Sequence, residues 1–352
     1  MSTSDLRVVT LFCLLAGAAQ ASEPAPLFSD DTALDVRIKA PMKVLMDVRP
    51  DEADLKGSFT FTDIDGEERE VSLKLRTRGN YRRDASHCDF APIRLDFPKN
   101  DVYRTLLSGQ NKLKLVTHCR NYEFEFEYYL FREYLAYRLF SELTDVSYRV
   151  RLMNVTYIDP QEDTEITRFG FVIEDDKAVA KRNGLKFAKI RHVTLDDHDR
   201  ARQNLVNVFQ FMIGNTEYSL TSPEPDKKCC HNIDLLSATK EAPFIAVPFD
   251  FDFSGLVSAS YAEPNPRYPI KSVRTRFYKG RCANNDLLPE TLEFFRRKRD
   301  DLFAIVDQVS DIDEKAASAT RPARQYVEDF YELIDDPEEV RKQLIEHCDE
   351  PS

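Results

Sequence analysis

Alternation of apolar and polar residues dominates the chain from residue 34 onward. Residues 58–62 and 71–75 alternate on either side of Asp65-Gly66, a pair that favours a two-residue hairpin turn. The same period of two predicts strands over 93–97, 113–117, 149–158 and 169–174. We therefore expect the first part of the protein to be mostly antiparallel sheet.

A period of three to four residues predicts helices elsewhere. Apolar residues recur at helical spacing between residues 122 and 143, which indicates a long core helix. Asp196 is a suitable N-cap for a helix that runs through Met212. Two more helical stretches cover 289–309 and 324–348. Strands first and helices after, with a few inserted strands, predict an α+β fold with a sheet-rich N-lobe and a helix-rich C-lobe.

The N-terminal residues have the pattern of a targeting segment. Arg7 precedes an apolar run over 8–16, and small residues occupy cleavage spacing before residue 22, so residues 1–21 are interpreted as a signal peptide. Residues 22–33 are polar and proline-containing and predict a flexible lead-in. No later run is long enough for a membrane-spanning helix. We expect a periplasmic or secreted protein without a transmembrane segment after cleavage.

Cysteine content and net charge limit the cellular compartment and the classes of function that the protein can have. Beyond Cys13 the cysteines are even in number, which predicts disulfides in an oxidising compartment. The expected pairs are Cys88 with Cys119, and Cys282 with either Cys229 or Cys230. The net charge of -12 argues against a nucleic-acid binder, which needs a cationic surface. The absence of a G-x-S-x-G motif argues against a serine hydrolase.

Candidate metal ligands lie near the end of the stretch from residue 215 to 255. Asp250 and Asp252 are two apart, so on an extended strand both carboxylates leave one face while the neighbouring phenylalanines pack on the other. Such a pair suits Mg²⁺ or Mn²⁺. The ordinary interpretation is an acidic pair that caps a turn. We favour the metal, because unpaired charges in an apolar strand are costly to bury.

Glu217 and Asn232 extend this candidate site. Glu217 follows a helix stop, where its carboxylate can accept the proton of an attacking hydroxyl. Asn232 offers an uncharged oxygen to the same metal. Either residue alone is an ordinary loop residue. Together with Asp250 they match the set that a phosphoryl-transfer site uses, and we expect the three to converge on one point.

Candidate phosphate-binding residues come earlier in the chain. Arg78, Gly79 and Asn80, followed by Arg82 and Arg83, form a loop whose guanidinium and backbone N–H groups suit phosphate oxygens. A basic surface turn is an equally good local interpretation. Lys112 and Lys114 are candidate partners for the phosphates of a nucleotide, and Glu174 is a candidate ion-pair partner for one of the lysines.

The order of these motifs resembles the spore-coat CotH kinase-like family over roughly residues 70–256. The residues that carry the resemblance are Arg78-Gly79-Asn80, the lysine-bearing stretch 111–115, the aromatic helix, the stretch 169–174, the Asn215 loop, His231-Asn232 and Phe249-Asp250-Phe251-Asp252. The resemblance implies a secreted, atypical protein-kinase-like fold over residues 34–310. Its N-lobe would cover about 34–190 and its C-lobe about 191–310, with residues 311–352 as a C-terminal helical extension.

The resemblance also implies ATP and a divalent metal as cofactors. It places Glu217 at the position of the catalytic aspartate, and Asn232 and Asp250 at metal-binding positions. Two positions depart from the family pattern, because Glu217 replaces an aspartate and Tyr218 replaces a basic residue. A side chain one methylene longer displaces the carboxylate by about 1 Å, which can cost about 100-fold in rate.

The leading hypothesis is an exported phosphotransferase that moves a phosphoryl group from ATP to Ser or Thr of an envelope or surface protein. The alternative is a catalytically inactive kinase-like module that binds an envelope partner through the same cleft. A third and weaker interpretation is a purely structural secreted domain.

Overall fold

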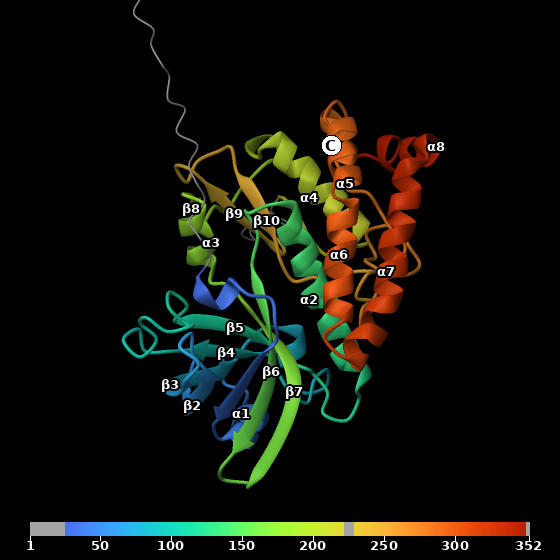
Figure 1. Ribbon diagram of the computed structural model, residues 1–352. Coiled ribbons are helices and arrows are strands. Elements are labelled where there is room, and N and C mark those ends of the chain that lie inside the picture. The colour runs from blue at the N-terminus through green and yellow to red at the C-terminus, as the bar shows by residue number, and fades with distance from the viewer. Residues whose placement is uncertain (1–24, 222–228, 350–352) are drawn as a thin grey trace, which may run out of the picture.

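The computed structural model describes residues 25–221 and 229–349 (Figure 1). The signal peptide expected over 1–21 lies outside these residues. Within the described part of the chain, no helix combines the length and apolar character needed to cross a membrane.

Seven strands form a closed barrel, the lower body in Figure 1. Their order around the barrel is β1-β2-β3-β4-β5-β7-β6. The strands are β1 (Leu34–Lys39), β2 (Leu55–Thr62), β3 (Glu68–Thr77), β4 (Ile93–Asp96), β5 (Lys112–Val116), β6 (Val150–Asp159) and β7 (Thr164–Ile173). The alternating residues of the sequence are therefore confirmed as strands, and their apolar side chains fill the barrel.

Pairing of the first strand with β6 closes the barrel. β1 pairs antiparallel with β2 and, on its other edge, parallel with β6 from Leu34↔Met153 to Lys39↔Ile158. The sheet therefore keeps no open edge at this point. The expected two-lobed protein-kinase-like fold, whose N-lobe sheet is open, is wrong. The protein is α+β, with a closed barrel of seven mixed strands.

Eight helices are present in the described residues, and most form a second body above the barrel. They are α1 (Met42–Val48), α2 (Glu125–Leu143), α3 (Asp176–Arg182), α4 (Arg200–Met212), α5 (Leu288–Arg297), α6 (Arg299–Ser310), α7 (Glu314–Asp335) and α8 (Pro337–Val340). α2 lies between barrel strands in sequence, yet its buried face joins the core of α4, α6 and α7. This helix connects the two bodies.

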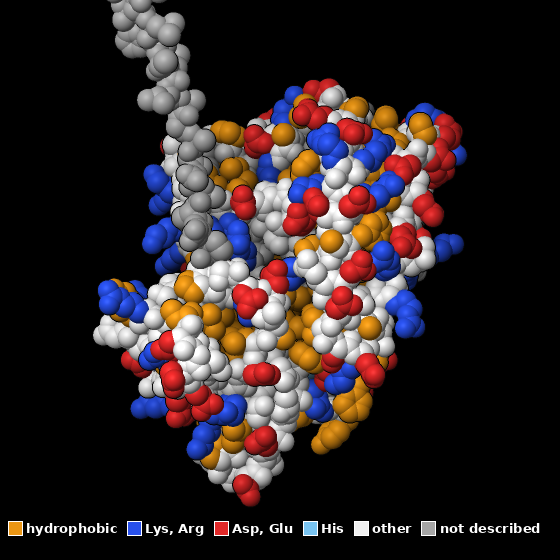
Figure 2. Space-filling model, viewed as in Figure 1, with side chains coloured by type: hydrophobic (Ala, Val, Ile, Leu, Met, Phe, Trp, Pro, Cys, Tyr) orange, Lys and Arg blue, Asp and Glu red, His pale blue; other side chains and the backbone are white. Residues whose placement is uncertain are grey.

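The last part of the chain belongs to the same core. Ala319, Ala323, Val327, Phe330 and Ile334 of α7 are all fully buried with α2. α7, which lies within the expected C-terminal helical extension, thus packs in the core of the helical body. Acidic and basic side chains alternate over the outer face of this body (Figure 2). The net negative charge is therefore distributed, and ion pairs such as that of Arg296 with Asp335 offset part of it.

A small sheet and an N-terminal segment complete the fold. β8 (Lys186–Phe187), β9 (Ile233–Ser237) and β10 (Ile245–Pro248) pair antiparallel in the order β10-β9-β8. Residues 25–33, expected to be a flexible lead-in, bury Leu27 and Phe28 against the barrel. Arg151 of β6 holds this segment by hydrogen bonds to the backbone and carboxylate of Asp30.

Three disulfides are present in the described residues. The expected Cys88–Cys119 pair is confirmed. Cys282 pairs with Cys348, and Cys229 pairs with Cys230, so the expected pairing of Cys282 with one of that couple is wrong. The physical reason is the position of the C-terminal segment, whose Asp349 hydrogen-bonds to Gly280 and brings Cys348 beside Cys282.

The Cys282–Cys348 bond is expected to stabilise the protein substantially, because it closes a loop of 66 residues. Double replacement by serine should lower the free energy of unfolding by about 4 kcal/mol, as loop-closure entropy implies. The measurement is denaturant unfolding of both proteins, with non-reducing peptide mapping of the wild type. A peptide that joins Cys282 to Cys229 or Cys230 would contradict this disulfide assignment.

Candidate functional site

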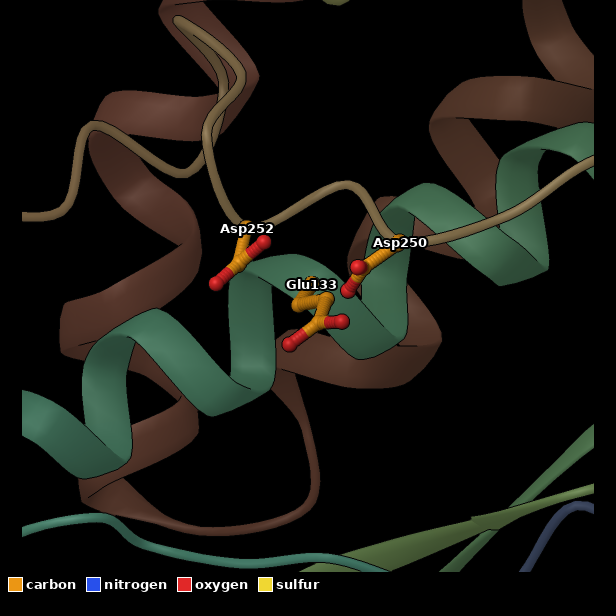
Figure 3. Close-up of side chains that lie close together, drawn as sticks. All are labelled: Glu133, Asp250 and Asp252. Atoms are coloured by element: carbon orange, nitrogen blue, oxygen red, sulfur yellow. The ribbon is translucent and has the colours of Figure 1, made fainter. Parts of the chain in front are cut away.

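Three carboxylates from two separate segments meet where the barrel faces the helical body. Glu133 lies on α2, and Asp250 and Asp252 follow β10 (Figure 3). One oxygen from each side chain lies within 4.8 Å of the others. Glu133 and Asp252 are buried, whereas Asp250 is exposed. We call these three residues the carboxylate cluster.

Local backbone geometry directs the two aspartates into this cluster. β10 ends at Pro248, so the strand expected to carry both aspartates stops before them. Asp250 has a φ of 63°, a left-handed conformation that Asp tolerates better than most residues. Its N–H donates to the hydroxyl of Tyr137 at 2.8 Å. Phe251 is fully buried against Tyr137 and anchors the turn.

Arg82 lies among the three carboxylates. It belongs to the short helix η2 (Tyr81–Arg83) that follows β3. Its guanidinium approaches Glu133 at 3.0 Å, Asp252 at 3.3 Å and Asp250 at 3.7 Å. When all three carboxylates are ionised, the one guanidinium leaves the cluster with two excess negative charges. One divalent cation would neutralise them. Both oxygens of the buried Glu133 carboxylate lie next to Arg82, with Oε2 at 3.0 Å and Oε1 accepting from it at 3.2 Å.

Burial dominates the acid–base behaviour of the cluster. It raises the pKa of Glu133 to about 8 and the pKa of Asp252 to about 6. The positive charge of Arg82 opposes both pKa shifts, and the negative charge of Asp250 reinforces both. The hydroxyl of Tyr261 donates to Asp252 at 3.1 Å, which favours its charged form. Protons and cations therefore compete for the same buried oxygens.

A small cavity adjoins the cluster and has cations on its wall. Its volume is about 20 Å³, which is room for a single ion or water. The charged residues on its wall are Arg78, Arg82, Lys114, Glu133 and Asp250. The remainder of the wall is apolar or aromatic and comes from β5, β7, α2 and the segments next to β6 and β10. A cation and the oxygens of a phosphate would both find partners at this place.

Two predicted phosphate-binding residues face this cavity. Arg78 directly follows β3, and burial lowers its pKa while the charge of Asp250 raises it. Lys114 on β5 pairs with Asp176 at 2.7 Å and lies above the rings of Tyr148 and Phe249. Both cations thus come from the barrel side of the cavity.

The other predicted phosphate-binding residues lie elsewhere. Gly79 and Asn80 are exposed, and Gly79 makes the turn with a φ of 85°. Lys112 pairs with Asp96 at 3.4 Å. Glu174 is fully buried and pairs with Arg182 of α3 at 3.0 Å, not with a lysine. None of these four side chains lines the small cavity.

Glu217 lies in a different environment from the carboxylate cluster. Its carboxylate accepts from His231 at 3.1 Å, and this hydrogen bond lowers the pKa of Glu217. Asn232 links the two places, because its side-chain amide donates to the carbonyl of Glu217 and its own carbonyl accepts from the N–H of Phe249. The structure thus brings Asp250 together with Asp252, and Glu217 together with Asn232.

Glu217 forms part of the wall of a larger pocket with a volume of about 770 Å³. Other polar residues on its wall include His231, Asn265, Arg267 and Lys279. Several aromatic rings, including that of Tyr268, complete the wall. We call this the Glu217 pocket. Its size is typical of pockets that bind a substrate.

Neither the known protein-family models nor the curated proteins include a match to this chain. The likeness to the CotH kinase-like family therefore rests on the quoted motifs alone.

The sequence pattern did not single out two central residues, Glu133 and Lys279. Glu133 lies within the predicted core helix, where a charged residue is expected at the surface, yet it is only 1% exposed. Lys279 lies in a stretch without a periodic pattern. The burial of Glu133 had a weak signal in the sequence. Glu133 falls three residues after Leu130 and one residue before Tyr134, both of which are core residues.

Replacement of Glu133 by Gln should change how stability depends on pH. Between pH 4.5, the ordinary pKa of the side chain, and about pH 8, Glu133 keeps its proton in the folded protein and loses it in the unfolded chain. The stability due to protonated Glu133 is complete below pH 4.5 and is lost as the pH rises through 8. Gln remains neutral, so wild-type stability relative to Glu133→Gln should fall across this window by up to about 1.4 kcal/mol per pH unit.

The measurement is urea unfolding of both proteins at several pH values in the presence of a chelator. A difference in unfolding free energy that stays constant, or that grows in favour of the wild type as the pH rises, would contradict the elevated pKa of Glu133.

Proposed function

We propose that this protein transfers a phosphoryl group from ATP to a hydroxyl of Ser or Thr in an envelope or surface protein, with Mg²⁺ or Mn²⁺ as cofactor. The observation that carries the proposal is the meeting of the carboxylate cluster with Arg78 and Lys114 at one small cavity. Phosphoryl transfer needs this combination, since carboxylates hold the metal while guanidinium and ammonium groups neutralise the phosphate oxygens.

Asp250 is the primary metal ligand in this proposal. It is the exposed member of the cluster, and within the part of the chain that the structure describes its one ion pair is a distant one, at 3.7 Å with Arg82. Glu133 and Asp252 supply further oxygens, and Asn232 lies beside the backbone of Phe249 next to Asp250. A bound metal lowers the charge repulsion among the three carboxylates and would supply the electrostatic stabilisation of the transferred group.

Glu217 orients the acceptor hydroxyl. Its hydrogen bond with His231 keeps the carboxylate charged, as a proton acceptor requires. The Glu217 pocket provides the space for the acceptor, and the link through Asn232 connects it to the metal side. The three disulfides support export to an oxidising compartment. The proposal keeps the chemistry that the CotH resemblance implies and not its fold.

One observation favours the second candidate, a non-catalytic module that binds an envelope partner. The small cavity has room for an ion and not for a nucleotide, and Arg82 already contacts all three carboxylates. Nucleotide binding by these residues therefore requires the barrel and the helical body to separate at the cavity. A thermal-shift response to a partner protein, without any response to ATP and Mn²⁺, would favour the binding module.

Asp250→Asn should abolish transfer of labelled phosphate from ATP in the presence of Mn²⁺. The variant keeps the size of the side chain but loses the charge that binds the metal, so the rate should fall by more than about 100-fold. Asp47→Asn is the matched control, because Asp47 is an exposed aspartate on the barrel helix α1. No transfer by the wild type, or equal transfer by Asp250→Asn, would overturn the enzyme proposal.

Glu217→Gln should slow transfer by about 100-fold or more, since the amide cannot accept the proton of the hydroxyl. ATP binding, measured by thermal shift with Mn²⁺, should remain unchanged, because Glu217 lies outside the carboxylate cluster. Glu263→Gln serves as control, since Glu263 is an exposed glutamate two residues before Asn265. Full activity of Glu217→Gln would leave this residue without the proposed role.

A further inference from the structure

Lys279 holds the segment that carries Glu217. Its ammonium group donates to the carbonyl oxygens of Thr216 and Tyr218, which lie on either side of Glu217. It also lies over the ring of Tyr218 at 4.0 Å and near that of Tyr268 at 5.1 Å. The ammonium is therefore fixed in position on the wall of the Glu217 pocket.

This ammonium has unused capacity to bind an anion. It carries three N–H donors, and two carbonyls account for two of them. Among the described residues, no carboxylate forms an ion pair with Lys279 within 4.0 Å. Burial lowers the pKa of Lys279 to about 8, and the charges of Glu217 and Asp349 only partly offset this shift. An anion placed at the third donor would compensate the buried charge.

Two arginines extend the positive character of the pocket. Arg267 is exposed and has no ion-pair partner among residues 25–221 and 229–349. Arg281 pairs with Asp196 through one nitrogen, while its buried Nε has no hydrogen-bond acceptor in the described residues. The acids on the same wall are Glu217, which pairs with His231, and Asp349. Asp196 offsets the charge of Arg281, so Lys279 and Arg267 are the two cations of this wall that have no carboxylate ion-pair partner among the described residues.

We infer that the Glu217 pocket selects a peptide acceptor in which aspartate or glutamate residues flank the Ser or Thr, and that Lys279 and Arg267 bind the flanking carboxylates. The inference rests on the proposed function, because it takes the pocket beside Glu217 as the acceptor site. The hydroxyl would lie next to the Glu217–His231 pair while the acidic side chains reach the cations. A basic peptide would place like charges together, which disfavours its binding.

The test is the affinity of the full mature protein for labelled peptides of equal length, measured by fluorescence anisotropy without nucleotide. The peptides carry one Ser flanked by Glu, by Gln or by Lys. The Glu peptide should bind at least about tenfold more tightly than the Gln peptide, as one charge-assisted hydrogen bond implies. Added salt should reduce this advantage. Equal affinity for the Glu and Gln peptides, or a preference for the Lys peptide, would overturn the inference.

Variants identify the residues responsible. Arg267→Gln and Lys279→Met should each remove most of the advantage of the Glu peptide, whereas Lys271→Met should retain it, because Lys271 is exposed and does not line the pocket. Arg267→Gln keeps the test decisive if Lys279→Met disturbs the Glu217 segment, since the side chain of Arg267 makes no hydrogen bond among the described residues. An Arg267→Gln protein with unchanged peptide preference contradicts the assignment.

The same experiments separate this inference from the proposed function. Selective binding of the acidic peptide by a protein that transfers no phosphate would leave the acceptor pocket in place and remove the enzyme proposal. Phosphate transfer without any preference for acidic flanks would do the reverse. Competition by a neutral oligosaccharide at the same site would indicate a glycan acceptor and overturn the peptide assignment.

Discussion

The contact of Arg82 with buried Glu133 and Asp252 and with exposed Asp250 is the interaction on which the site depends. It joins the loop after β3 to α2 and to the turn after β10, so three distant segments share one electrostatic centre. Removal of one partner from such a buried pair typically costs about 3–5 kcal/mol, because the other charge is left uncompensated. Because carboxylates outnumber guanidinium groups, the cluster also favours the binding of a second cation beside Arg82. Structure and proposed chemistry thus have the same physical origin.

Local patterns predicted most of the secondary structure. The Asp65-Gly66 hairpin is observed between β2 and β3, and the long apolar helix is α2. The cap of α4 is Asp199 in place of the expected Asp196, a small shift that does not move the end of the helix at Met212. Closure of the barrel could not be predicted, because the β1–β6 pairing joins strands far apart in the sequence and neither strand carries a local signal for it.

The site was predictable only where its residues are neighbours in the chain. The spacing of Asp250 and Asp252 indicated a shared acidic face, and their oxygens do converge, although through a left-handed turn after the strand and not within it. Glu133 reaches them from α2 through tertiary packing, which no spacing rule contains. Lys114 and Arg78 line the small cavity, whereas Glu174 forms an ion pair with Arg182. The sequence shows which residues are charged, but it does not show which residues form ion pairs with one another.

The central claim is that Asp250 and its neighbours bind a divalent metal that supports phosphoryl transfer. Its most direct test is a crystal structure of the mature protein soaked with Mn²⁺ and a non-hydrolysable ATP analogue, with data collected at the manganese absorption edge. The account predicts an anomalous peak within about 2.5 Å of a carboxylate oxygen of Asp250, with the phosphates of the analogue next to Arg78 or Lys114. Manganese bound only elsewhere, or an analogue bound away from these cations, would contradict it.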